Sequence, residues 1–98
     1  MAHPNTGEPV VLTGSAPGTG SAPARVYIAN ARGKESFARE IEFHNEDGAN
    51  ALRVGFGGTA YLLIAAGEKR KFTAQVSWFT VQSNAVGAVS WRAMAAVA

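Results

Sequence analysis

The stretch that decides the fold is "SFAREIEFHN", residues 36–45. In an extended chain, successive side chains point to opposite faces, so alternate residues share a face. One face of this stretch is apolar apart from Arg39, and it carries Phe37, Ile41 and Phe43. The opposite face carries Ala38, Glu40, Glu42 and His44. This period of two predicts a β-strand with one buried face and one solvated face.

The same pattern recurs through most of the chain. Further runs rich in β-branched or aromatic residues occupy residues 24–31, 51–56, 60–65, 70–77, 79–83 and 88–97. Segments rich in Gly, Asn, Asp and Lys separate these runs. About seven strands at a spacing of about 8 to 12 residues predict an all-β protein, either a small barrel or, as we favour, an antiparallel β-sandwich resembling a jelly roll.

The run at residues 88–97 is ambiguous, because its alanines would also suit a helix. Ser90, Arg92 and Met94 alternate with Trp91, Ala93 and Ala95, and this alternation favours a strand. Alternation also predicts the core, which consists of Val26, Ile28, Phe37, Ile41, Phe43, Leu52, Val54, Phe56, Leu62, Ile64, Phe72, Val76, Phe79, Val81 and Trp91.

The N-terminal quarter has a different composition. Residues 1–24 contain one charged side chain, Glu8, and residues 14–24 consist of Gly, Ser, Ala, Pro and Thr. Such a segment buries too little apolar surface to offset its chain entropy. We therefore predict a flexible arm over residues 1–24 and a sandwich domain over residues 25–98. Val10, Val11 and Leu12 form a β-prone island in the arm, which we expect to dock on the domain or on a neighbouring subunit and to be the main partner contact.

Length and charge restrict the function. The chain has 98 residues, a net charge of +2 and no cysteine. It forms one domain with a modest core, and it lacks the clustered basic face of a nucleic-acid-binding protein. Because there is no secretory signal pattern and no apolar run near the roughly 18 residues that span a bilayer, we expect a protein that folds in the cytoplasm without a membrane partner.

A polar cluster at residues 44–48 resembles a site at first sight. A metal would need further ligands to converge on His44, yet the other histidine, His3, lies in the predicted arm. Asp47–Gly48 instead predicts a tight turn with a positive φ, and "GFGG" at residues 55–58 predicts a bend. We expect no metal, no cofactor and no catalysis.

Two surface features remain open. "EKRK", residues 68–71, places Lys69, Arg70 and Lys71 together, either as the solvated start of an edge strand or as a contact for an acidic partner. Trp78, Phe79 and Trp91 form either a stacking platform or part of the core.

Three segments resemble small β-sandwich virion proteins of tailed bacteriophages, in particular capsid decoration (cement) proteins. They are "IEFHNEDGANALRVGF" (41–56), "LLIAAGEKRKF" (63–72) and "FTVQSNAVGAVSWRAMA" (79–95). The resemblance implies a non-enzymatic protein that binds and stabilises the capsid lattice. Its partner would be the major capsid protein or another virion protein, and it would be a trimer or dimer located in the virion after synthesis in the host cytoplasm. No catalytic or ligand-binding residue transfers with the resemblance.

Two alternatives stay open. One is a different virion part, such as a tail or fibre domain. The other is a carbohydrate-binding module, which would expose Tyr61, Trp78 and Trp91 on one face.

Overall fold

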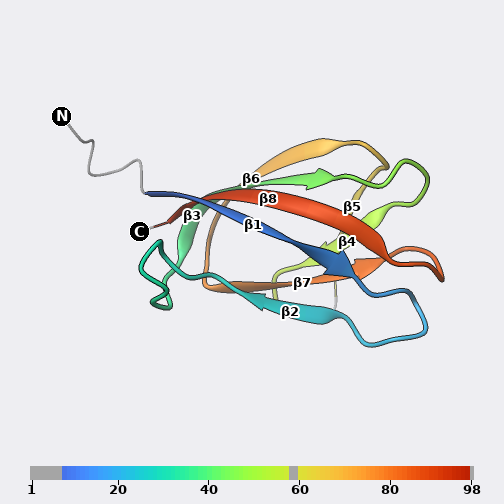
Figure 1. The fold of residues 1–98 in the computed structure, drawn as a ribbon, viewed down its shortest axis with the longest axis horizontal. Coiled ribbons are helices and arrows are strands. Elements are labelled where there is room, and N and C mark those ends of the chain that lie inside the picture. The colour runs from blue at the N-terminus through green and yellow to red at the C-terminus, as the bar shows by residue number, and fades with distance from the viewer. Residues whose placement is uncertain (1–7, 58–59, 98) are drawn as a thin grey trace.

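A computed structural model describes residues 8–57 and 60–97 of the chain (Figure 1). Its regular structure is entirely strand: β1 (Glu8–Ala16), β2 (Ala24–Tyr27), β3 (Ala38–Asn45), β4 (Leu52–Gly55), β5 (Leu62–Ile64), β6 (Lys69–Val76), β7 (Trp78–Ser83) and β8 (Val89–Val97). The prediction of an all-β protein is confirmed. So is the assignment of the alanine-rich C-terminal segment as a strand, because β8 pairs with β1 on one side and with β3 on the other.

The strands form two four-stranded sheets packed as a sandwich. Sheet I has the order β1-β8-β3-β6, and sheet II has the order β2-β7-β4-β5. The antiparallel pairs β1–β8, β2–β7, β3–β6 and β4–β5 are nested, so the chain runs out and back as one long ribbon. The ribbon is wound so that β8 also pairs with β3 and β7 with β4, which gives a jelly-roll strand order, in agreement with the predicted jelly-roll-like sandwich (Figure 1).

The additional strand relative to the seven predicted is β1, which lies inside the predicted arm. Its full length pairs with β8, from Glu8 opposite Val97 to Ala16 opposite Val89. The boundary predicted at residue 24 is therefore corrected: residues 8–16 belong to the sandwich, and the following loop carries the chain from sheet I to sheet II. The start of the predicted arm, residues 1–7, lies outside the described residues.

The core lies between the sheets and matches most of the prediction. The predicted residues that are fully buried are Ile28, Ile41, Phe43, Leu52, Val54, Ile64, Phe79, Val81 and Trp91. Val26, Phe56, Phe72 and Val76 are partly buried and pack against them. Phe43 is central, because its ring lies 5.0 to 6.2 Å from the rings of Phe56, Phe72 and Phe79. Leu62 is an exception with 38% of its surface exposed, because it lies on the edge strand β5.

A β-bulge in β3 corrects the predicted orientation of its first residues. Ala38 faces Val97 and Glu40 faces Ala96, so Arg39 is an extra residue without a counterpart on β8. As a result Ala38 is fully buried and Phe37 only half-buried, the reverse of the prediction. The bulge also explains why Arg39 interrupted the apolar face in the sequence.

Asn45, the last residue of β3, connects both sheets at one end of the sandwich. Its side chain is fully buried and donates to the carbonyl oxygens of Asn50 (2.8 Å) and Ile64 (3.0 Å). Its Oδ1 accepts from the backbone N–H of Asp47 (2.9 Å), and its backbone bonds to Gly67 and Glu68. One side chain thus fixes the β3–β4 loop and the start of the β5–β6 turn.

The turn predicted at residues 45–50 is confirmed, but its geometry differs. Gly48 does not have a positive φ, which occurs at Gly33, Gly57 and Gly67. The turn is instead made by side chains, since Asp47 Oδ2 accepts from the backbone N–H groups of Ala49 (2.9 Å) and Asn50 (2.7 Å). Asx turns of this kind need no left-handed residue.

We expect Asn45→Ala to lower the free energy of unfolding by about 2 to 4 kcal/mol. The change leaves two buried carbonyl oxygens and one backbone N–H without partners. Urea denaturation followed by tryptophan fluorescence measures this.

Asn45→Asp keeps the size and shape of the side chain, so it tests the contribution of the hydrogen bonds separately from that of packing. A carboxylate at this position would face two carbonyl oxygens, so its folded-state pKa should rise above the unfolded value. The deficit relative to wild type should therefore be greatest at neutral pH and shrink as the pH falls below the folded pKa. A deficit that stays constant between pH 7 and pH 4 would contradict the role assigned to the Asn45 amide.

Candidate binding surfaces

The residues predicted as partner contacts lie on the two opposite edges of sheet I. Val10, Val11 and Leu12 are on β1, and Lys69, Arg70 and Lys71 are on β6. Within β1, Val10 and Leu12 point inward and pack partly against the core, whereas Val11 points outward with 56% of its surface exposed. Val11 is therefore the most exposed side chain of this predicted group, and Val10 and Leu12 are partly buried.

The basic cluster of β6 is divided between two faces. Lys69 and Lys71 lie opposite His44 and Glu42 on the outer face of sheet I. Arg70 lies opposite Phe43, on the inward side, and forms an ion pair with Glu68 at 2.8 Å. Alternation along the strand therefore turns Arg70 away from Lys69 and Lys71, and the role of these three cations as a partner contact stays a prediction.

The structure places two of the predicted contacts, Val11 on β1 and Lys71 on β6, in one line across sheet I. Val11 pairs with Met94, Met94 with Glu42, and Glu42 with Lys71, so these four residues form a cross-strand row on the outer face, which we call the outer row. Met94 is 54% exposed and lies directly beside Val11. Sequence reasoning missed Met94, although its position on the polar side of β8, with Ser90 and Arg92, was a usable signal.

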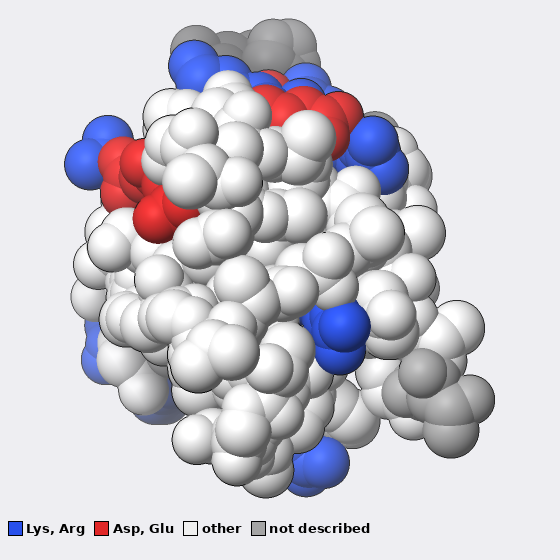
Figure 2. All heavy atoms as spheres, turned by 90° about the vertical axis from the view of Figure 1, so that its right-hand side faces the viewer, with Lys and Arg blue, Asp and Glu red and all other residues white. Residues whose placement is uncertain are grey.

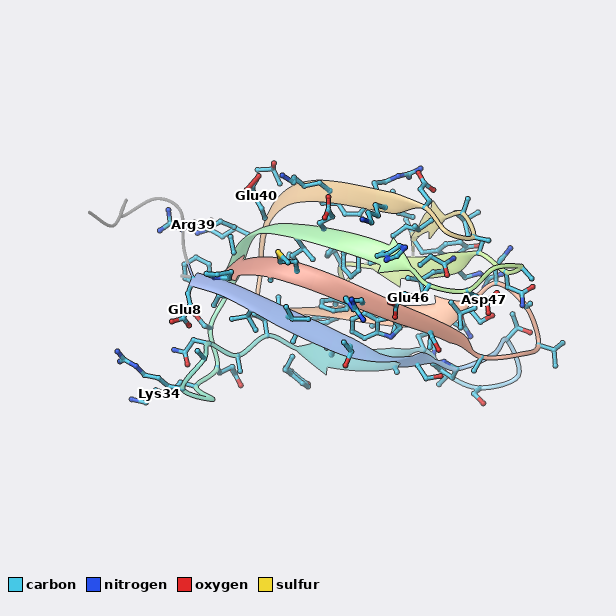
Figure 3. The ribbon with its side chains drawn as sticks, turned by 45° about the horizontal axis from the view of Figure 1, so that its top comes forward. Glu8, Lys34, Arg39, Glu40, Glu46 and Asp47 are labelled. Carbon is cyan, nitrogen blue, oxygen red and sulfur yellow. The ribbon has the colours of Figure 1, made fainter. Side chains whose placement is uncertain are left out.

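A shallow hollow of about 250 Å³ adjoins the outer row. It is lined by Pro9, Glu40, Glu42, Lys71, Met94, Ala95 and Ala96. Figure 3 shows Glu40 beside Arg39 at the start of β3, far from Glu46 and Asp47 at its other end. The outer face of sheet I thus carries Val11 and Met94 on its β1–β8 side, and Glu40, Glu42, Lys69 and Lys71 on its β3–β6 side.

The outer face of sheet II has a different character. It carries Arg25 and Tyr27 from β2, Trp78 from β7, Arg53 from β4, and Tyr61 just before β5, and we call this set the arginine–aromatic face. Each arginine covers a ring: Arg25 Cζ lies 4.1 Å from the ring centroid of Trp78, and Arg53 Cζ lies 4.7 Å from that of Tyr61.

The three residues expected to share a sugar-binding face are separated. Tyr61 and Trp78 lie on the outer face of sheet II, but Trp91 is only 2% exposed and packs edge-on against Phe79 in the core. Of the two interpretations of Trp78, Phe79 and Trp91, the core interpretation holds for Phe79 and Trp91.

The end of the sandwich where the β1–β2 and β7–β8 loops meet is largely uncharged, as Figure 2 shows. The loops are joined by hydrogen bonds from Thr19 N to Ala85 O (2.9 Å) and from Ser83 N to Pro17 O (2.8 Å). Gly18 lies so close to the β7–β8 loop that a Cβ would overlap the carbonyl oxygen of Val86. Val86 itself is 88% exposed.

Two turn carboxylates have pKa values shifted by hydrogen bonds. Backbone N–H groups of Asn50 and Ala49 lower the pKa of Asp47. The backbone N–H of Ala65, and then the guanidinium of Arg70, lower the pKa of Glu68. In both cases the partners favour the charged form, as expected for side chains that hold a turn.

In the part of the chain that the structure describes, no group of three or more His, Cys, Asp or Glu side chains is arranged to hold a metal ion. His44 lies half-buried on the outer face of sheet I, and His3 lies outside the described residues. Nor does any helix long and apolar enough to cross a membrane occur within residues 8–57 and 60–97.

The fold and its two outer faces define the chain as a jelly-roll β-sandwich. Comparison with known proteins found no protein-family model and no curated protein that matches it.

We expect Gly18→Ala to destabilise the fold by about 1 to 3 kcal/mol, because its methyl group meets backbone that can yield only by moving the β7–β8 loop. Gly20→Ala, in the same loop, is a matched control, since a Cβ there meets nothing within 4 Å. Thermal unfolding of both variants measures the difference. Equal melting temperatures would show that the two loops are not packed as described.

Lowering the pH should reduce the free energy of unfolding as the Asp47 carboxylate becomes protonated. Its folded-state pKa lies below the ordinary value of 3.8, so its contribution is fully present above that value and is lost as the pH falls through the folded pKa. Asp47→Asn should therefore be less stable than wild type at pH 7, and the gap should narrow below about pH 4. Urea midpoints at pH 7, 5 and 3 test this, with Glu40→Gln as a control for the loss of one exposed charge. A gap in stability that is as large at pH 3 as at pH 7 would contradict it.

Proposed function

We propose that this protein is a non-enzymatic structural subunit that binds and stabilises the capsid lattice of a phage virion, as decoration proteins do. The proposed partner is the major capsid protein or another virion protein, and the proposed location is the virion. The observation that carries the proposal is the outer row, in which two exposed apolar side chains lie side by side at the β1 end and two oppositely charged side chains continue the row.

Val11 and Met94 have the chemistry of a protein contact. Covering an exposed apolar pair with a partner is favourable in free energy, and methionine adapts its shape to irregular surfaces. Glu42 and Lys71 continue the same row with opposite charges, which favour one orientation of a partner over others. The adjoining hollow gives a protruding partner side chain a place to insert.

The free edge of β1 supports assembly into a dimer or trimer. β1 is nine residues long and, within residues 8–57 and 60–97, pairs with β8 on one side only, so its other edge presents backbone groups to a neighbour. Weak contacts of one subunit become strong when a symmetric lattice repeats them. We therefore propose a homo-oligomer whose affinity for the lattice comes from several equivalent outer rows.

Two other functions remain as alternatives. A tail or fibre domain would use the same kind of surface against a different virion component. A carbohydrate-binding module is supported by the position of Tyr61 and Trp78 on one face, but Trp91 is buried and guanidinium groups lie over the other two rings. The aromatic surface open to sugar stacking is therefore smaller than the sequence suggested.

The test is to replace the apolar part of the outer row by polar groups of similar size. We expect Val11→Thr combined with Met94→Gln to weaken binding to capsid particles assembled without this protein by about tenfold or more, because about 1.5 to 3 kcal/mol is available for burying each side chain. Co-sedimentation over a range of concentrations measures the affinity.

Leu63→Gln is the matched control, because Leu63 is 45% exposed but lies on sheet II. It should bind as wild type does. If wild type does not bind particles, the proposed function is wrong. If the double variant binds as tightly as wild type, the outer row is not the contact.

A further inference from the structure

We propose that the arginine–aromatic face of sheet II is a second binding site, which takes an extended acidic segment of a partner protein through two carboxylates. Arg25 and Arg53 are the groups that would hold them. The site goes beyond the proposed lattice contact, because it lies on the other sheet and uses none of the residues of the outer row.

Arg25 is positioned by the aromatic side chains around it. Its guanidinium lies over the Trp78 ring, and one Nη donates to the hydroxyl of Tyr27 at 3.4 Å. Stacking on an aromatic face orients the planar guanidinium and removes part of its water. A guanidinium has five N–H donors, so this arrangement leaves most of them for a ligand.

Arg53 is held more firmly. Its Nε donates to Asn84 Oδ1 at 2.8 Å, one Nη lies 3.5 Å from Gln82 Oε1, and its guanidinium lies over the Tyr61 ring. Gln82 is fixed in turn by a hydrogen bond to the carbonyl oxygen of Ser21 at 2.8 Å. These contacts place the guanidinium before a ligand arrives, which lowers the entropy lost on binding.

A hollow of about 90 Å³ lies beside the Arg53 guanidinium. Gly55 and Thr80 belong to its lining, and a Cβ on Gly55 would lie only 2.7 Å from Thr80 Oγ1. A side chain at Gly55 would therefore displace Thr80, which lines the same hollow. Its size suits a carboxylate group and the adjoining methylenes, and it is too small for a whole sugar ring or base.

The charged side chains on the strands of this face are all positive. None of the four strands of sheet II contains Asp or Glu. Among the described residues the ion pairs join Arg70 to Glu68 and Arg92 to Glu46, and neither involves Arg25 or Arg53. Two oriented cations that form no ion pair within the described residues complement a partner that supplies carboxylates.

The composition of the face favours an acidic protein segment over a nucleic acid or a carbohydrate as its ligand. Trp, Tyr and Arg are the residue types most enriched at the energetic centres of protein interfaces, where Lys, Asp and Glu are depleted. Nucleic-acid binding needs more phosphate contacts than two arginines provide, and base or neutral sugar stacking needs ring faces that are not already covered.

The register sets the separation of the Cα atoms of the two arginines, which is the basis for choosing the spacing of the ligand groups. Arg25 lies opposite Thr80 on one side of β7, and Arg53 lies opposite Gln82 on the other side. Two strand spacings across the sheet and two residues along it separate their Cα atoms by about 12 Å. An extended peptide advances about 3.3 Å per residue, so carboxylates four residues apart lie on one side of it at the matching distance.

The experiment uses the full chain and synthetic ten-residue peptides of Gly, Ser and Thr that carry two glutamates. One peptide has the glutamates four residues apart, a second has them adjacent, and a third has glutamines instead. Binding is followed by Trp78 fluorescence and by amide chemical shifts. We expect the four-residue spacing to bind several-fold more tightly than the adjacent pair, the glutamine peptide not to bind, and the shifts to map to β2, β4 and β7.

Arg25→Lys and Arg53→Lys should each weaken binding of the first peptide about tenfold, because lysine keeps the charge but loses the planar fork and the stacking. Lys71→Arg on sheet I is the matched control and should leave the affinity unchanged. An effect of the arginine variants no larger than that of the control would overturn the proposal. Tighter binding of a neutral oligosaccharide or of single-stranded DNA than of the first peptide would overturn the assigned ligand class. The capsid-binding test does not depend on either result.

Discussion

The hydrogen bonds of the Asn45 side chain are the constraint on which the arrangement of the two sheets depends. Asn45 ends β3 in sheet I, while its amide binds the carbonyl oxygens of Asn50, just before β4, and of Ile64, in β5 of sheet II. Only an amide supplies two donors and an acceptor at this length. Because Phe43, two residues earlier on the same inward face, is at the centre of the aromatic core, the position of Asn45 also fixes how the core side of β3 is packed.

A jelly roll held in this way has two outer faces that are free to differ. The inward side chains of both sheets are committed to one apolar core, whereas the outward side chains have no common constraint. In sheet I the outward positions combine Val11 and Met94 with flanking charges, and in sheet II they combine two arginines with aromatic rings. A small protein with two unlike faces is suited to bridging two partners, which is consistent with the proposed role in a virion.

Much of the fold could be predicted from the sequence because alternation is a local signal. The strand type of residues 88–97 and most of the core followed from it, Trp91 among them. The bulge at Arg39 could not be predicted, since one extra residue in a strand is defined only by its partner strand. The arginine–aromatic face was also hidden, because Arg25 and Trp78 come together only when β2 pairs with β7. Asn45 was predicted as a turn residue, but its acceptors lie on segments whose approach the sequence does not show.

The strand that the sequence concealed most completely, β1, shows why composition misled. Gly14 lies opposite Trp91, and a Cβ there would come within 3.1 Å of the indole ring. Ala16 is fully buried opposite Val89, and Gly18 must make room for the carbonyl oxygen of Val86. The small residues that resembled a flexible tether are therefore required by close packing against β8 and its loop. In a thin sandwich, the edge strand beside the largest core side chain has to be small, and its sequence then resembles that of a linker although it is part of the sheet.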